Sequence, residues 1–164
     1  MATIIKSTTI RRSPDEVFAY LDDLAAHKEW QGGVEEIKVV TDGPTRAGSE
    51  VEETRVVGPG RKIEMRWRVT EHDPATRRSA FETLESPMMK PSGVISVAAA
   101  DGDSEVTFEM HTNPVGFGKL LSPLMTRDVR KSIDGDLERL KQRLEGAGDG
   151  ASGPARAGAD AGGA

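Results

Sequence analysis

The longest helical pattern in the chain is SPLMTRDVRKSIDGDLERLKQRLE, residues Ser122–Glu145. Four large apolar residues recur on one side of it at helical spacing: Ile133, Leu137, Leu140 and Leu144. Pro123 after Ser122 suits a first helical turn, and Gly146 suits a stop. A stripe of this length needs a broad apolar surface against which to pack, and the rest of the chain has to supply it.

That surface is predicted to be a curved antiparallel sheet. The first strand is expected over Thr3–Arg11, and six more follow at Val34–Thr41, Glu50–Val57, Lys62–His72, Arg78–Glu85, Ser92–Ala99 and Glu105–Thr112. Apolar and polar residues alternate in them, and each connection is short and carries Gly, Pro or Asp, as hairpins require. Between the first two strands, Ser13-Pro14-Asp15-Glu16 predicts a capped helix, followed by a second short helical piece.

In such a meander, successive turns alternate between the two ends of the sheet. One end collects polar turns. The other, which we call the loop-rich end, collects residues 58–61, 86–93 and 113–119, and the final helix begins there. Because residues 86–93 and 113–119 carry Met88, Met89, Val115 and Phe117, this end is predicted to be apolar.

Composition narrows the function classes. The net charge is −5, from 22 basic and 27 acidic residues that are interspersed, so nucleic acid is not expected as a partner. There is no cysteine, and no apolar run approaches the roughly 18 residues that span a bilayer. No signal peptide is visible, so a soluble, cytoplasmic protein is expected. Residues 146–164, with 7 Gly and 7 Ala, are predicted to be a flexible tail after a single domain over 1–145.

The stretch SPDEVFAYLDDLAAHKEW (13–30), followed by Gly48-Ser49 before a strand, resembles the START-like superfamily, in particular its polyketide cyclase/dehydrase and lipid-transport branch. The resemblance covers about Ala2 to Leu144 and implies an α+β helix-grip fold. In that fold seven antiparallel strands wrap around the long C-terminal helix, with two short helices between strands 1 and 2. It also implies a ligand cavity between sheet and helix that opens at the loop-rich end.

Strand parity and the start of the helix give candidates for lining this cavity. They are Trp30, Met65, Trp67, Phe81, Met88, Phe108, Met110, Phe117, Leu120, Leu121 and Leu124. Plain core packing is the competing interpretation for each. For Trp30 an anchoring role is preferred, and for Met88 and Met89 folding back over the core is preferred to a mobile lid. A low aromatic content of 4% and several methionines favour a cavity.

The polar candidates for catalysis are Glu53, Arg55 and Glu85. If Val51 and Val57 face inward, Glu53 and Arg55 do so too. The opposite parity turns Thr54 and Val56 inward and leaves the pair in solvent, and this solvent-exposed arrangement is the preferred interpretation. The same ambiguity holds for Glu85.

No metal site and no cofactor are expected. His27, His72 and His111 lack metal-ligand spacing, and alternation places His72 and His111 on the outer face of the sheet. No serine lies in a nucleophile elbow.

Three functions remain. The first is binding or transport of a small hydrophobic ligand, such as a lipid, fatty acid or aromatic polyketide-like compound. The second is a polyketide cyclase/dehydrase-like enzyme that moves protons with pocket carboxylates. The third is a protein-interaction module with a filled core and an apolar patch at the loop-rich end. Binding is preferred over catalysis. Transient membrane contact at the apolar end remains open, and the oligomeric state does not follow from the sequence.

Overall fold

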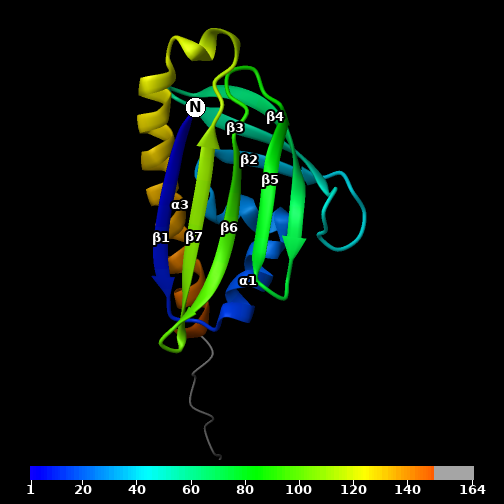
Figure 1. The fold of residues 1–164 in the computed structure, drawn as a ribbon, viewed down its shortest axis with the longest axis vertical. Coiled ribbons are helices and arrows are strands. Elements are labelled where there is room, and N and C mark those ends of the chain that lie inside the picture. Colours follow the sequence, from blue (N-terminus) through cyan, green and yellow to red (C-terminus); the bar gives the residue numbers. More distant parts are fainter. Residues whose placement is uncertain (150–164) are drawn as a thin grey trace, which may run out of the picture.

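A single seven-stranded antiparallel sheet wraps around one face of a long helix in the computed structural model, which describes residues 1–149 and their side chains as far as residue 146 (Figure 1). The strands are β1 Ala2–Ile10, β2 Val34–Val39, β3 Glu50–Val57, β4 Arg61–Asp73, β5 Arg78–Glu85, β6 Ser92–Ala100 and β7 Asp103–Thr112. The helices are α1 Pro14–Asp22, the 3₁₀ turn η1 Leu24–Ala26, α2 His27–Trp30, the 3₁₀ turn η2 Gly116–Lys119 and α3 Ser122–Asp149. This confirms the predicted α+β helix-grip architecture.

The strand order is β1-β7-β6-β5-β4-β3-β2. Strands β2 to β7 form a continuous meander, and β1 joins it by pairing with β7, from Ala2 opposite Thr112 to Ile10 opposite Ser104. Because β1 and β2 lie on opposite edges, the chain between them has to cross from one edge to the other. The short helices α1 and α2 make this crossing over the lower part of the sheet (Figure 1).

Helix α1 begins where the sequence predicts. The Ser13 side chain accepts a hydrogen bond from the Glu16 amide at 3.4 Å, and the Ser13 amide donates to the Glu16 carboxylate at 3.1 Å. This reciprocal pair is a capping box, which satisfies two amides that a helix end leaves without intrahelical partners. Val17, Phe18 and Leu21 of the helix are buried.

The C-terminal part of α3, from Ile133 onward, provides most of the packing of this helix. Ile133, Leu137 and Leu140 are buried and join α1 and strands β1, β6 and β7 in one core cluster. A second, smaller cluster lies farther along the sheet and is centred on Val51, Trp67 and Val69. Helix α3 continues past Gly146 to Asp149, so the stop predicted at Gly146 is wrong. The remainder of the predicted tail, residues 150–164, lies outside the described residues.

A β-bulge in β4 changes which side chains face inward. Val69 pairs with Phe81 and Glu71 with Ala80, which leaves Thr70 as an additional residue. One extra residue reverses the alternation beyond it. His72 therefore points inward, where its Nε2 lies 2.7 Å from Asp22 Oδ1 and its ring stacks on Phe18. The prediction that His72 lies on the outer face is wrong for this reason, whereas His111 lies on that face beside Thr3 and Glu109.

Candidate functional site

The inner face of the sheet carries a row of aromatic rings. The centroids of Trp67 on β4 and Phe81 on β5 are 6.1 Å apart with an interplanar angle of 69°, and Phe81 and Phe108 are 6.1 Å apart and nearly parallel at 24°. Strand β6 lies between Phe81 and Phe108, and it places Gly93 opposite Phe81. A Cβ atom at Gly93 would lie 2.9 Å from the Phe81 ring, so the absence of a side chain there lets the two phenylalanines meet.

Several apolar side chains on this inner face remain only half-buried. They are Met65, Phe81, Phe108 and Met110, whereas Trp67 is 9% exposed. The first part of α3 covers them only in part: half-buried Val129 packs against the same core cluster as Phe108 and Met110, and no residue of α3 before Ile133 is buried. The inner face is therefore sealed beside the C-terminal half of α3 and less tightly covered beside its N-terminal half.

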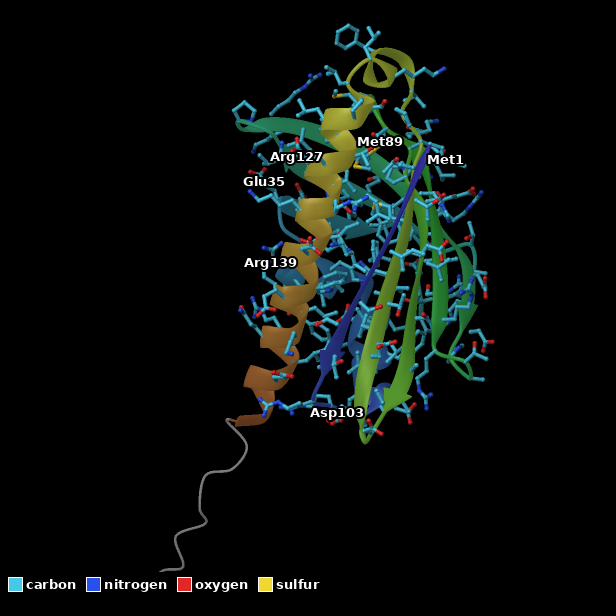
Figure 2. The ribbon with its side chains drawn as sticks, turned by 60° about the vertical axis from the view of Figure 1, so that its left-hand side comes forward. Met1, Glu35, Met89, Asp103, Arg127 and Arg139 are labelled. Atoms are coloured by element: carbon cyan, nitrogen blue, oxygen red, sulfur yellow. The ribbon has the colours of Figure 1, made fainter. Side chains whose placement is uncertain are left out.

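Two loops of the loop-rich end are joined to one another. Met89 forms an antiparallel bridge with Pro114, the Val115 amide donates to the Met88 carbonyl at 3.0 Å, and the Lys90 amide donates to the Asn113 carbonyl at 2.8 Å. Figure 2 shows Met89 and Met1 at this end of the molecule and Asp103 at the other. The prediction that residues 86–93 and 113–119 lie at the same end of the sheet is confirmed.

A buried carboxylate lies beside the aromatic row. Glu53 is 6% exposed; one oxygen accepts from Trp67 Nε1 at 3.1 Å and the other from Arg55 Nε at 2.6 Å. Arg55, whose side chain is 23% exposed, also donates from Nη2 to Gln31 Oε1 at 2.7 Å. Its Nη1 makes no hydrogen bond to any residue that the structure describes. The sequence-preferred interpretation, a solvent-exposed pair, is therefore wrong: Val51, Glu53 and Arg55 share the inward face of β3.

His27 connects this pair to the short helices. Its ring stacks on Trp67, with centroids 6.0 Å apart at 11°, and its Nε2 lies 2.8 Å from the Leu21 carbonyl. A carbonyl only accepts, so Nε2 carries the proton, and Nδ1 is left to accept from Gln31 Nε2 at 3.4 Å. Both contacts suit the neutral ring. Burial lowers the pKa of His27 below its ordinary value and favours the same form.

Helix α3 reaches the same region through Asp136 and Arg139. The Gly32 amide donates to Asp136 Oδ1 at 2.7 Å, Arg139 Nη2 pairs with the same oxygen, and Arg139 Nε donates to the Trp30 carbonyl at 2.9 Å. Burial raises the pKa of Asp136, while the Gly32 amide and the Arg55 and Arg139 guanidiniums oppose this rise. The segment from Trp30 to Gly32 is thus held by α3 and, through Gln31, touches Arg55.

The remaining candidates divide by position. Trp30 is buried in the larger core cluster, as its anchoring interpretation expects, and its Nε1 is buried without a hydrogen-bond partner among the described residues. Met88 is half-buried. Glu85 lies on the outer face, because β5 contains a bulge: Trp67 pairs with Thr83 but Arg66 with Glu85, which leaves Leu84 as the additional residue.

Four candidates between η2 and the first turn of α3 do not line an interior. Phe117 is 71% exposed, Leu120 75%, Leu121 38% and Leu124 60%. The prediction that these residues line the cavity, with Leu120, Leu121 and Leu124 closing its helix side, is wrong, because η2 and the first turn of α3 direct the side chains to the outside.

Sequence reasoning missed Gln31, His27, Asp136 and Arg139 as members of the polar cluster. Asp136 had a usable signal: it follows Ile133 by three residues and precedes Leu140 by four, so it lies on the buried stripe of the helix. Gln31 and Arg139 had none, since the contact of Gln31 with Arg55 and that of Arg139 with Trp30 join residues 24 and 109 positions apart.

One hollow of the described surface reaches the edge of this region. It is a depression of about 390 Å³ whose lining includes Glu53 and Met65 together with charged residues such as Glu36, Lys38 and the candidate Glu85. Another, of about 490 Å³, lies between α1 and the β2–β3 connection and contains Asp22, Asp23 and Asp42. Within residues 1–149, no group of three His, Asp or Glu side chains has a geometry suited to a metal ion.

Comparison with known proteins places this geometry in a family. The model of the family described as polyketide cyclase/dehydrase and lipid transport matches residues 1–145. Comparison with curated proteins gives no match.

Among solved structures, the protein TTHA0849 from Thermus thermophilus superposes with a TM-score of 0.77 at 20% identity, covering 89% of this chain and 99% of its own. The ZhuI aromatase/cyclase from Streptomyces sp. R1128 gives a TM-score of 0.77 at 18% identity, over 93% and 99% of the two chains. The di-domain aromatase/cyclase BexL of the BE-7585A biosynthetic pathway gives 0.70 at 20% identity, over 88% of this chain and 47% of BexL.

At these identities the structural neighbours show the shared fold, whereas the family match extends from the first strand to the last turns of α3. The chain therefore belongs to the polyketide cyclase/dehydrase and lipid transport family, within the START-like superfamily.

Proposed function

We propose that residues 1–145 form a ligand-binding domain that takes up a small hydrophobic compound between the inner face of the sheet and the N-terminal half of α3. The observation that carries this proposal is the row of half-buried apolar side chains, Met65, Phe81, Phe108 and Met110, which lie on or beside the core clusters and face residues 122–132 of α3, none of which is buried. Half-buried apolar groups gain free energy when a ligand removes their remaining exposed surface from water.

The ligand we infer is aromatic or polyene-like in its body and carries an acceptor oxygen at one end. Flat rings suit the faces of Phe81 and Phe108. The oxygen suits Arg55, which is oriented by Glu53 and Gln31 and retains one nitrogen without a hydrogen-bond partner among residues 1–146. A cytoplasmic location is part of the same proposal.

Native mass spectrometry of freshly purified protein, followed by organic extraction of the bound material, tests this proposal. The expected result is a stoichiometric apolar adduct, which then serves as the ligand in a tryptophan-fluorescence titration. Met65→Ala is expected to weaken binding about tenfold. The control Ile5→Ala should leave binding unchanged, because Ile5 lies on the outer side of β1 and is 60% exposed. A bare mass, together with no binding of apolar fluorescent probes, would reject the proposal.

A second candidate is a cyclase or dehydrase, which the buried Glu53–Arg55 pair favours. A carboxylate and a guanidinium beside an apolar space are groups that orient a poly-keto chain and transfer protons. Incubation of the extracted ligand or a poly-keto analogue with the protein, with products followed by mass spectrometry, separates the two functions. Turnover that disappears in Glu53→Gln supports the enzyme. Binding without turnover rejects it.

A further inference from the structure

Four large apolar side chains project from the corner where η2 meets α3. They are Phe117, Leu120, Leu121 and Leu124, with exposed fractions of 71%, 75%, 38% and 60%. We call this set the apolar tip. Scattered single apolar residues are normal on a protein surface, but four within eight consecutive residues form a patch that needs an explanation.

The backbone holds the apolar tip in this outward position. The Gly118 amide donates to the Val115 carbonyl at 2.9 Å, and the Leu120 and Leu121 amides donate to the carbonyls of Phe117 and Gly118 at 3.2 Å each. Gly118 itself is buried and lies directly against the Met88 carbonyl, where no side chain would fit. Because Gly118 is fixed on the β5–β6 loop, the neighbouring Phe117 and Leu120 are directed away from the domain.

Basic residues outnumber acidic ones in the part of the sequence that contains the apolar tip. Between residues 110 and 133 the chain has four basic residues, Lys119, Arg127, Arg130 and Lys131, and one acid, Asp128, which gives a local charge of +3 in a chain of net charge −5. All four basic side chains are exposed or half-exposed, and within residues 1–146 none of them forms an ion pair.

Helical spacing places part of this charge on the same face of α3 as Leu124. Arg127 and Lys131 stand at i+3 and i+7 from Leu124 and share its face, together with the acid Asp128 at i+4. The buried residues Ile133 and Leu140 occupy a different face. Figure 2 shows Arg127 on the part of α3 next to this corner.

From this juxtaposition we propose that the apolar tip docks onto the surface of a bilayer that contains anionic phospholipid. The apolar side chains enter the boundary between headgroups and acyl chains, and the basic residues bind lipid phosphates. The contact is peripheral, since no helix of the described residues is long and apolar enough to cross a membrane.

Charge distinguishes this partner from a second copy of the chain. A two-fold dimer through the apolar tip would bring two patches of +3 together, and like charges in contact oppose association. An anionic bilayer supplies the opposite charge together with an apolar layer. The tip also lies at the loop-rich end, so docking would bring the region of the half-buried inner residues close to the membrane surface.

Co-sedimentation with sucrose-loaded vesicles tests the proposal. The full-length protein is expected to pellet with vesicles of phosphatidylcholine and phosphatidylglycerol in equal parts, to pellet far less with phosphatidylcholine alone, and to be released by high salt. Phe117→Ser combined with Leu120→Ser is expected to weaken partitioning about tenfold or more, and Lys131→Glu to weaken it on anionic vesicles.

Ile5→Ser is the matched control, because Ile5 is also 60% exposed but lies outside the tip on β1. Since the substituted side chains lie on the surface, each variant should keep the thermal unfolding temperature of the parent. Equal loss in the control, or equal binding to neutral and anionic vesicles, overturns the proposal. A dimer seen by analytical ultracentrifugation that the Phe117/Leu120 variant dissociates would also overturn it and assign the tip to self-association.

Discussion

Glu53 has both carboxylate oxygens engaged, one by Arg55 and the other by Trp67. In Glu53→Gln the amide group has to face one of these two donors, so one hydrogen bond is replaced by a donor–donor contact. Because Arg55 retains some access to water, we expect a loss of about 1–3 kcal/mol in the free energy of unfolding. Urea denaturation measures this quantity.

Glu85→Gln is the matched control for this substitution. Glu85 is an exposed residue on the outer face of β5, so the same chemical change should alter the free energy of unfolding by less than about 0.5 kcal/mol. Equal effects of the two substitutions would show that the Glu53 hydrogen bonds contribute no more than a surface charge.

His27 makes stability dependent on pH on the acid side. Burial lowers its pKa below the ordinary value of 6.5, so on acidification the unfolded chain binds a proton at His27 before the folded protein does. The contribution of His27 is therefore fully present above about pH 6.5 and is lost as the pH falls towards its lower folded pKa. Urea midpoints measured from pH 7.5 downwards should fall. His27→Gln, whose side-chain amide still donates to Leu21, should reduce that slope, and an unchanged slope would contradict the assignment.

At the scale of the element, α3 contains a glycine that its packing does not require. A Cβ atom at Gly135 would find its nearest neighbour in the Arg139 guanidinium at 3.4 Å, which is ordinary contact with the end of a flexible side chain. Gly135→Ala should therefore raise the free energy of unfolding by about 0.5–1 kcal/mol through helix propensity.

Gly118→Ala serves as the comparison for Gly135→Ala. A methyl group at Gly118 would collide with the Met88 carbonyl. The substitution should destabilise the protein in the same urea experiment. If Gly135→Ala were also destabilising, close approach of α3 to its neighbours would be the reason for that glycine.

At the scale of the whole molecule, the folded protein is held by two core clusters, and a ligand that binds between sheet and helix should add to its free energy of unfolding. One cluster joins the C-terminal half of α3 to β1 and β7, and the other joins Leu24 to β3 and β4. A ligand that binds between the inner face and α3 binds only the folded protein. At a concentration of about 100 times Kd it should add about 2.7 kcal/mol, which raises Tm by roughly 5–11 °C.

Differential scanning fluorimetry with the extracted compound measures this shift. At the same ligand concentration, Met65→Ala should show a smaller rise than the parent, and Ile5→Ala the same rise. An identical shift in all three proteins would place the binding site elsewhere than the inner face.

Local patterns in the sequence determined the architecture. Alternation along Ile63–Val69 and Val106–Thr112, hairpin turns, the Ser13–Glu16 box and the stripe from Ile133 to Leu140 each depend on residues close in sequence. Such short-range signals predict strands, caps and helices directly, and the order of these elements is enough for the helix-grip fold.

Only the tertiary structure decided which polar residues face inward. The direction of Glu53 and Arg55 depends on which face of β3 the rest of the molecule covers, and a one-residue bulge reverses the side chains that follow it, as at His72 and Glu85. The contact of Gly32 with Asp136 joins residues 104 positions apart. The exposure of Leu120 follows from how Gly118 packs on Met88. These outcomes depend on packing between distant segments, and a pattern read along the chain carries no information about that packing.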